Sequence, residues 1–361
     1  MNEGEVMDKN SRYIDMVLLS KVPTKMPLRL NQLFHTLTGK RTASNLYQAQ
    51  LFGLLPIFSL IEKTTKAELE ALIIKWANKG WVHLKDDSFY KSNEGGRVVG
   101  TFFSTHDYPA SIEYGRYGKA VTLFWQRIQL IAQVVSNREY TQLHYFPIIQ
   151  DREIQIWVKQ WLKQSGAKLS SKTFGQELLT ILSKLHNQQA DFIARSLSGY
   201  QQIGLTEAQR ASVFGYEKEI IDLRFQDALH HFFQLALNEP NQSLIHQIAL
   251  LSDQDTSFGV SASTYQTIQL IQSGKTPQTV AQIRKLKDGT VWEHIVEWAI
   301  LHPESNYVSL IPFDIYQKGS QMIQDNEDLS FADIKEKIDD IHFVWYRLIQ
   351  IERNYLNEQQ H

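Results

Sequence analysis

Residues 261–301 read SASTYQTIQLIQSGKTPQTVAQIRKLKDGTVWEHIVEWAIL. This stretch contains three short segments whose apolar residues recur about every 3.6 positions, which is the period of an amphipathic helix. The first segment predicts a helix over 263–272, with its apolar face at Tyr265, Ile268 and Ile271. Gly274 should end this helix, because glycine readily takes the positive φ of a helix C-terminus.

The second and third helices are each preceded by a turn signal. Thr276 is the expected N-cap of the second helix, and Pro277 fits its first turn because the N–H that proline lacks has no helical partner there. We expect Asp288-Gly289 to turn the chain and Thr290 to begin the third helix, with Glu293 in the capping-box position. The residues expected to face inward are Val280, Ala281, Ile283, Leu286, Val291, Ile295 and Trp298. His294 and Glu297 should face outward.

Three helices with glycine-containing turns indicate a helix-turn-helix, whose last helix commonly enters a DNA groove. The candidate DNA contacts are Arg284, Lys285, Lys287, Thr290 and His294. Phosphate binding needs positive charge, and the stretch sets four Lys or Arg residues against three acids, so its charge leaves DNA contact undecided. The alternatives are a plain three-helix end of a bundle, or a helix-turn-helix that contacts protein through an exposed face with Trp292.

The same stretch resembles the helicase-associated helix-turn-helix domain at the C-termini of many RecQ-type DNA helicases. The resemblance rests on Gly274, on the run Val280–Arg284, and on the run Thr290–Ile295. The sequence DIHFVWYRLIQIERNYL at 340–356 is similar to the last helix of that domain. The resemblance implies a DNA-binding or docking domain that works with a RecQ-type helicase.

Two central runs resemble the YpbB family of stand-alone bacterial proteins. They are AVTLFWQRIQLIAQVVSN at 120–137 and FPIIQDREIQIWVKQWLKQ at 146–164. Genes of that poorly characterised family commonly neighbour one for a RecQ-type helicase. This resemblance implies an accessory factor that acts on the helicase or beside it.

Residues 13–93 predict a winged-helix-like domain. Helical patterns over 30–37, 42–51 and about 65–79 precede WVHLKDDSFYKS, whose alternation around two aspartates predicts a hairpin. Residues 16–61 contain no Asp or Glu but five Lys or Arg residues. The candidate phosphate contacts are Lys40, Arg41 and Lys75 on helices, with Lys85 and Lys91 in the wing. The alternative is a winged helix used for dimerisation or protein docking.

The remaining chain predicts a helical scaffold. Residues 93–109 read as a linker or extended wing, 110–250 as a central helical domain, 253–259 as a second linker, and 260–357 as the helix-turn-helix domain. The central aromatic residues recur at helical spacing, which favours a core over base-stacking surfaces. GLTEAQRASVFGY at 204–216 predicts a helix capped by Thr206 and carrying Arg210, and we expect it to belong to the scaffold.

Composition bounds the function. The formal net charge is −2, so any nucleic-acid binding must come from a local basic patch. The chain has no cysteine, which excludes thiol catalysis and thiolate metal sites. No apolar run is long enough for a membrane span, and the first residues carry no signal-peptide pattern, so we expect a cytoplasmic protein.

The search for catalytic chemistry gives no candidate. Neighbouring His230-His231 would point about 100° apart on a helix and could not chelate from one face. The run Asp339–His342 is expected to be ordinary helix surface. Nucleotide-loop, hydrolase and metalloprotease motifs are lacking, so we expect no enzyme activity, no metal and no cofactor.

The sequence therefore predicts a mainly α protein with one small β-wing. The favoured function is a non-enzymatic DNA-binding accessory factor in recombination, repair or replication, with DNA and a RecQ-type helicase as partners. One alternative is a protein–protein adaptor that does not touch DNA. Another is a transcriptional regulator, which would need sequence-specific operator binding, usually by a dimer.

Overall fold

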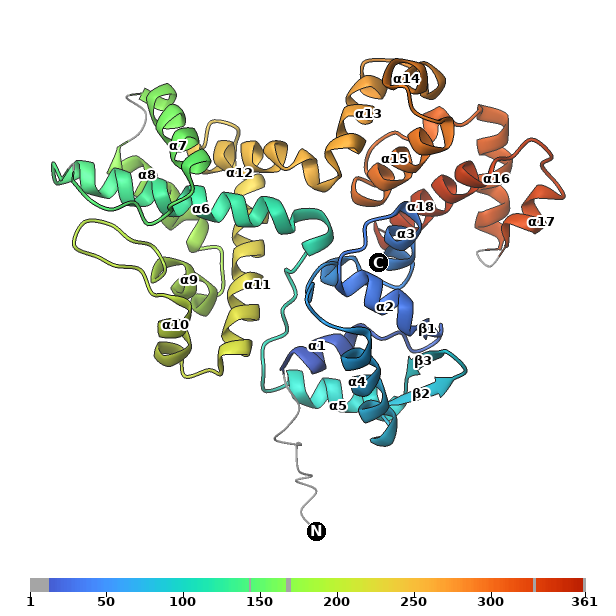
Figure 1. Cartoon of the computed structure of the whole chain (residues 1–361), viewed down its shortest axis with the longest axis horizontal. Helices are drawn as coiled ribbons and strands as arrows, with labels where there is room; N and C mark the ends of the chain where they lie inside the picture. Colours follow the sequence, from blue (N-terminus) through green and yellow to red (C-terminus); the bar gives the residue numbers. More distant parts are fainter. Residues whose placement is uncertain (1–12, 143, 167–169, 327–328, 360–361) are drawn as a thin grey trace, which may run out of the picture. The chain divides into compact units, whose positions relative to one another are not determined.

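The computed structural model describes residues 13–142, 144–166, 170–326 and 329–359, and it is mainly α (Figure 1). The chain forms two compact units. The first unit comprises Met1–Thr38 and Phe52–Thr256, and the second comprises Gly39–Leu51 and Ser257–His361. A segment from near the N-terminus therefore belongs to the same unit as the C-terminal helices. The domain boundaries predicted from the sequence stay predictions.

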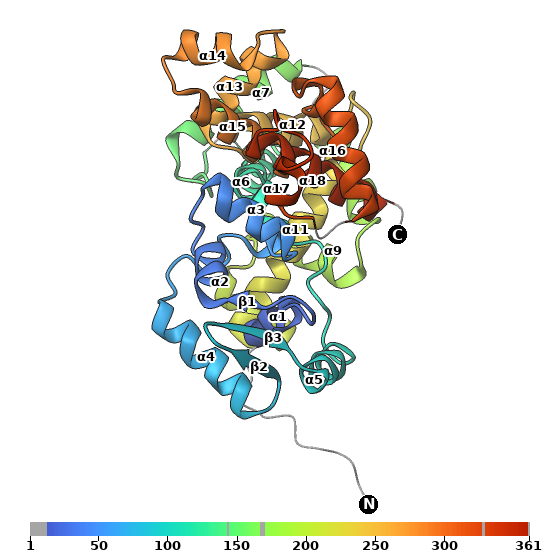
Figure 2. The ribbon, with the colours of Figure 1, turned by 90° about the vertical axis from the view of Figure 1, so that its right-hand side faces the viewer.

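The first unit begins with helices around a small antiparallel sheet. Its elements are α1 (Tyr13–Lys21), β1 (Leu28–Arg29), α2 (Leu30–Leu37), η1 (Leu55–Ile57), α4 (Lys66–Asn78), β2 (Val82–Lys85), β3 (Ser88–Lys91) and α5 (Asn93–Phe103). The strands pair in the order β1-β3-β2, and α4 packs against β2 (Figure 2). The predicted hairpin is confirmed, with Leu84 opposite Phe89. Thr65 and Glu68 form a capping box at the start of α4.

The expected linker over 93–109 is wrong over its first half, which forms α5. The Ser92 side chain caps this helix by accepting a hydrogen bond from the Gly95 N–H at 2.9 Å. A Cβ on Gly95 would lie 2.1 Å from the Trp81 carbonyl oxygen, so glycine allows the helix to approach the hairpin backbone. Gly95 and Gly96 predict a break in a helix, but Gly95 lies inside α5 and allows close packing.

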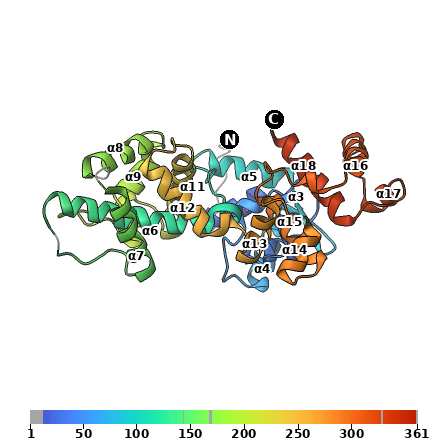
Figure 3. The same ribbon diagram turned by 90° about the horizontal axis from the view of Figure 1, so that it is seen from above.

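The rest of the first unit is a helical bundle. Its helices are α6 (Tyr114–Glu139), α7 (Arg152–Ser165), α8 (Ser171–Leu182), α9 (Asn187–Ala194), α10 (Glu207–Phe214), α11 (Lys218–Leu237) and α12 (Leu244–Asp255). The long helix α6 packs against α11 and α12 (Figure 3). The core expected from the aromatic spacing is confirmed, because Phe124, Phe232 and Phe233 are fully buried together.

The second unit contains the helix-turn-helix stretch and the helices that support it. Its elements are α3 (Ala43–Leu51), η3 (Ser257–Gly259), α13 (Ala262–Gln272), α14 (Pro277–Arg284), α15 (Asp288–Leu301), η4 (Val308–Leu310), α16 (Phe313–Asp325), α17 (Phe331–Lys335) and α18 (Phe343–Gln359). Helix α15 packs against α13, α14, α18 and α3. The run 339–342 lies in the turns between α17 and α18, so the expectation that it is helical is wrong.

The turn before α15 differs from its prediction. Lys285 takes the left-handed conformation that ends α14, with φ 54°, and Lys287 is the N-cap of α15. Helix α15 therefore begins two residues before Thr290, and Asp288 lies in its first turn, where the helix dipole favours a carboxylate. The expected turn at Asp288-Gly289 is wrong because a non-glycine residue already supplies the positive φ.

Candidate nucleic-acid interface

Helices α13, α14 and α15 form the three-helix unit expected from the sequence. Gly274 has φ 85° after α13, and the Thr276 side chain caps α14 by accepting a hydrogen bond from the Thr279 N–H at 3.2 Å. The predicted inward orientation is confirmed for five residues, which are buried: Val280, Ala281, Val291, Ile295 and Trp298. Ile283 is 53% exposed, so its predicted inward orientation is wrong.

The exposed basic residues of the three helices lie in the two turns that connect them, Lys275 before α14 and the other two before α15. Lys275, Lys285 and Lys287 are exposed, and Thr290 is half-buried. Two exposed acids, Asp288 and Glu293, lie beside them on α15. From Ile295 to Leu301 every residue of α15 is buried, so only its first two turns face solvent. The surface available for DNA is small, and its charge is nearly balanced.

Arg284 ties α14 to α13 while remaining partly exposed. Its guanidinium donates to the Ser263 carbonyl at 2.5 Å, to the Thr267 hydroxyl, and to Gln266 Oε1 at 3.1 Å. Burial lowers the pKa of Arg284. Because these hydrogen bonds join two helices, loss of Arg284 would disturb the fold of the three-helix unit as well as any phosphate contact.

His294 is also hydrogen-bonded within the three-helix stretch. Its Nδ1 and the Thr267 Oγ1 are hydrogen-bonded at 2.8 Å, and the ring is half-buried. Burial, and then the Arg284 guanidinium, lowers the pKa of His294, which favours the neutral ring. A neutral imidazole can contact a base or sugar but attracts phosphate weakly.

Glu297 does not face outward, so that expectation is wrong. Its carboxylate is buried and accepts hydrogen bonds from Arg41 Nε at 2.7 Å, from the Ser261 N–H at 3.1 Å, and from Thr264 Oγ1 at 2.5 Å. Arg41 also donates to the Gly259 carbonyl at 2.5 Å. The carboxylate therefore holds together the start of α13, helix α15 and the segment before α3.

Helix α3 belongs to the same compact unit as the three-helix stretch. The Tyr47 hydroxyl donates to Gln350 Oε1 at 2.7 Å, and the Arg347 guanidinium lies 4.1 Å from the centre of the Tyr47 ring. Burial raises the pKa of Tyr47 to about 12. Sequence reasoning missed this docking because 256 residues separate Arg41 from Glu297 and no local pattern reports such a contact.

The basic residues predicted as phosphate contacts in the N-terminal region lie in two different units and differ in exposure. Lys40 is exposed beside α3, whereas Arg41 is bound to Glu297 within the second unit. In the first unit, Lys75 is half-buried on α4 and Lys85 is exposed at the hairpin tip next to Asp86 and Asp87.

Lys91 is held within the first unit. Its Nζ donates to the Ser20 carbonyl at 2.7 Å, and burial, followed by Lys21, lowers its pKa. Lys85 is thus the wing lysine that is exposed, and Lys91 would have to leave a hydrogen bond to reach a phosphate.

Trp292 lies half-buried on the exposed part of α15. Its ring packs edge to face against the Trp345 ring, with the centroids 6.2 Å apart. The His342 ring, directly before α18, packs in the same way against Trp345, with the centroids 4.4 Å apart. Trp292, Trp345 and His342 therefore form one aromatic group, and the docking role of Trp292 stays a prediction.

The structure also locates the residues considered for metal binding. His230 is fully buried, and its Nδ1 accepts a hydrogen bond from the Glu113 N–H at 3.2 Å, whereas the His231 Nδ1 pairs with Gln189 Oε1 at 2.9 Å. Within the described residues, no three His, Cys, Asp or Glu side chains gather in a way that would hold a metal ion. Among those same residues no helix combines the length and apolar character that crossing a membrane requires.

Comparisons with known proteins agree with the C-terminal assignment. A family model described as a helix-turn-helix domain matches residues 263–350. No solved structure matches the chain. Protein YpbB of Bacillus subtilis (strain 168) is 27% identical over 283 residues, which is 77% of this chain and 80% of that protein. The chain is therefore similar to Protein YpbB over most of its length, and it carries a C-terminal helix-turn-helix domain, a fold typical of DNA binding.

Proposed function

We propose that this protein is a non-enzymatic DNA-binding accessory factor of the cytoplasm that serves recombination, repair or replication together with a RecQ-type helicase. The helix-turn-helix match over residues 263–350 carries the proposal. The resemblance of residues 274–295 to the helicase-associated domain supports the choice of partner. The likeness to Protein YpbB supports a stand-alone accessory role, although its name states no activity.

The mechanism is positioning by charge. Lys285 and Lys287 in the turn into α15, and Lys275 in the turn before α14, would bind phosphates, and the N-terminus of α15 would add its positive helix dipole. Thr290 and the neutral His294 ring would contact sugars or bases. The two acids on the exposed turns weaken this attraction, so we expect modest affinity with a strong salt dependence.

A second DNA contact would lie in the first unit. The order α1-β1-α2, then α4 and the β2-β3 hairpin, supports a winged-helix assignment, with α4 as its reading helix. Lys85 at the hairpin tip and Lys75 on α4 are the phosphate contacts that this assignment suggests. Lys40, another predicted phosphate contact, belongs to the second unit and not to this site.

Fluorescence anisotropy with single-stranded, duplex and forked DNA tests the proposal. The double variant Lys285→Glu/Lys287→Glu should lower affinity at least tenfold, and the slope of log K against log salt on duplex should become shallower by about 2. Lys318→Glu/Lys337→Glu, two exposed lysines of the same unit outside the three-helix stretch, is the matched control. Equal binding by both variants, or no binding by the wild type at low salt, would contradict direct DNA contact.

A protein–protein adaptor is the second candidate. The observation that favours it is the aromatic group of Trp292, Trp345 and His342 next to the exposed acids of α15. In this case Trp292→Ala should abolish co-purification with the helicase at both low and high salt, and Lys285→Glu/Lys287→Glu should leave co-purification unchanged.

A further inference from the structure

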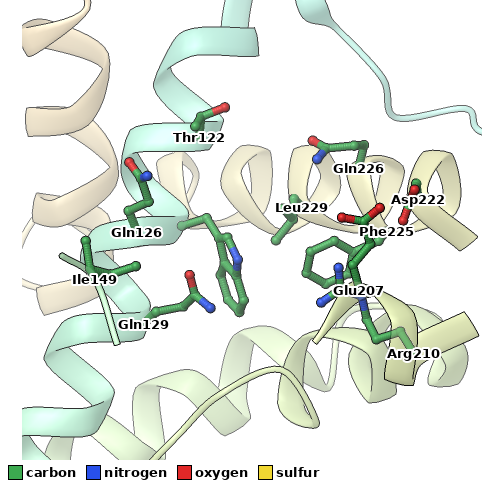
Figure 4. A pocket seen from close by; sticks show the side chains of 11 residues that line it. Thr122, Gln126, Gln129, Ile149, Glu207, Arg210, Asp222, Phe225, Gln226 and Leu229 are labelled. Atoms are coloured by element: carbon green, nitrogen blue, oxygen red, sulfur yellow. The ribbon is translucent and has the colours of Figure 1, made fainter. Parts of the chain in front are cut away.

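One side of α6 carries a stripe of uncharged polar residues that ends in an exposed tyrosine. Its members alternate four and three residues apart, so they lie along one face of the helix: Thr122, Gln126, Gln129, Gln133, Ser136 and Tyr140. The first three line a cavity of about 450 Å³ beside α10 and α11 (Figure 4). The last three contact two loops at the C-terminal end of α6.

The loop between α9 and α10 is fixed on this stripe and presents Tyr200. The Tyr200 N–H donates to Ser136 Oγ at 3.0 Å, and Gly199 and Gln202 exchange backbone hydrogen bonds at 2.9 and 3.2 Å. A Cβ on Gly199 would lie 2.6 Å from Ser136 Oγ, so glycine allows the loop to approach the helix. Ile203, in the same loop, is 84% exposed. The backbone of the loop is therefore ordered while a large apolar side chain faces solvent.

The segment that follows α6 is fixed on the same stripe and presents Phe146. The Gln133 amide donates to the Phe146 carbonyl at 3.0 Å, and its Oε1 accepts from the Ile148 N–H at 2.9 Å. The Phe146 side chain is nevertheless 94% exposed. Since Gln133 and Ser136 are three residues apart, the two loops are anchored about 4.5 Å apart along the helix axis. The exposed apolar side chains of both loops therefore gather at one end of α6.

Tyr140 and Tyr200 form a flat aromatic platform at this end. Their rings are stacked, with the centroids 4.3 Å apart and the planes 15° apart. Tyr140 is 60% exposed, so the face of its ring that does not meet Tyr200 is open to solvent. An exposed ring that is already ordered by a stacked neighbour offers a base a stacking surface at a small cost in entropy.

The charges next to the platform are mainly positive. Arg138 lies two residues before Tyr140 and is exposed. The carboxylate between them, Glu139, accepts a hydrogen bond from the Ser171 hydroxyl at 2.7 Å, and the exposed Lys172 follows Ser171. Two cations therefore flank the platform, and the neighbouring acid is engaged by a hydroxyl group. This arrangement suits an anion that needs few phosphate contacts.

We propose that this surface, made of Tyr140, Phe146, Tyr200 and Ile203, binds single-stranded DNA by base stacking. Residues 140–150 and 196–206 contain no Asp, Glu, Lys or Arg, so the centre of the surface neither repels phosphate nor offers an ion pair to a charged protein segment. In duplex DNA the faces of the bases are covered by their stacked neighbours, so the surface selects a single strand. Every base has a π-face, and the thymine methyl group adds an apolar contact.

The proposal goes beyond the helix-turn-helix and uses none of its residues. Only the choice of DNA over RNA rests on the proposed function, because a helicase that unwinds DNA releases single DNA strands. The surface would hold such a strand while the helix-turn-helix contacts the adjoining duplex.

Fluorescence anisotropy of the full chain with a labelled thymidine oligomer of about 12 nucleotides tests the proposal. The background is Lys285→Glu/Lys287→Glu, which removes the phosphate contacts proposed for the three-helix stretch. In this background Tyr140→Ala should weaken binding at least fivefold, because one stacked base is lost, and Tyr140→Trp should restore binding. With two phosphate contacts, the slope of log K against log salt should be about −1.4.

Two further variants make the comparison decisive. Phe146→Ala, whose side chain is almost fully in solvent and does not support the core, should also weaken binding at least fivefold. Phe313→Ala removes a phenylalanine of α16 that is 75% exposed and is the matched control, so it should bind as the background does.

Photo-cross-linking locates the strand. A thymidine oligomer that contains one 5-iododeoxyuridine should cross-link to the tryptic peptides 139–152 and 196–210, which carry the four residues of the surface. An oligouridine RNA of the same length should bind more weakly, because it lacks the methyl group. Equal or tighter binding of this RNA would overturn the choice of DNA.

Three results would overturn the proposal itself. They are equal binding by Tyr140→Ala, Phe146→Ala and Phe313→Ala, cross-links confined to other peptides, and tighter binding of duplex than of single strand in the lysine background. If Tyr140→Ala instead lost co-purification with the helicase and kept its affinity for the oligomer, the surface would be a protein contact. Failure of the helix-turn-helix proposal has a different sign, which is equal duplex binding by the wild type and by the lysine variant.

Discussion

Replacing Arg41 with alanine distinguishes a DNA contact from a structural residue. Arg41 and Glu297 have side chains 25% and 10% exposed, with the two groups 2.7 Å apart. Removing one partner of a buried ion pair costs about 3–5 kcal/mol, because the remaining charge stays desolvated. Glu297 keeps its donors on Ser261 and Thr264, and Arg41 is partly exposed, so we expect the free energy of unfolding of the second unit to fall by about 2–3 kcal/mol.

Urea denaturation followed by tryptophan fluorescence measures this loss, and hydrogen exchange locates it. Exchange should accelerate in α13 and α15 and stay unchanged in the bundle of the first unit. Combining Arg41→Ala with Glu297→Gln should recover part of the loss, giving a coupling energy of about 1–3 kcal/mol. Lys40→Ala, at the exposed neighbouring position, should change stability by less than about 0.5 kcal/mol.

The opposite pattern would refute the structural role of Arg41. It consists of unchanged stability and unchanged exchange in Arg41→Ala, together with weaker DNA binding. Arg41 would then be the phosphate contact predicted from the basic N-terminal run.

Two further predictions concern the first unit. Burial lowers the pKa of His230 to about 4, below the 6.5 of an unfolded chain. The folded state therefore favours the neutral ring, so the stability that His230 contributes is fully present above pH 6.5 and is lost as the pH falls toward 4. Between pH 7 and pH 5 the free energy of unfolding of the wild type should therefore fall by about 2 kcal/mol more than that of His230→Leu. Urea titrations at the two pH values measure both. Gly95→Ala should destabilise by about 2–3 kcal/mol in the same titrations, because its Cβ would collide with the Trp81 carbonyl, whereas Gly96→Ala, with open space around it, should stabilise by about 0.5–1 kcal/mol.

Local signals in the sequence predicted the helix-turn-helix well. Gly274 and the Thr276-Pro277 pair act through backbone conformation and caps within a few residues, so their effects are visible without the fold. The turn at Lys285 could not be predicted from the sequence, because lysine rarely takes a positive φ. The hairpin of the first unit was likewise predicted from alternation and turn residues alone.

Contacts between distant residues were the part that the sequence could not predict. Glu297 lies on a helix with other charged residues and reads as solvent-exposed, yet its partner Arg41 comes from 256 residues earlier. Asp222 similarly resembles a surface charge of α11 until Glu207 and Arg210 of α10 are placed beside it. Periodicity reports which face of a helix is apolar, but it does not report which distant segment will cover that face.

The membership of Gly39–Leu51 in the C-terminal unit has a consequence for synthesis in the cell. Arg41 leaves the ribosome 256 residues ahead of Glu297, which at about 5–20 residues per second is a delay of roughly 13–50 s. Throughout that interval the apolar side of α3, with Leu46 and Tyr47, has no partner to cover it. We expect the nascent chain to depend on chaperones during this interval, and a rare-codon pause placed before codon 257 to increase aggregation of the newly made protein.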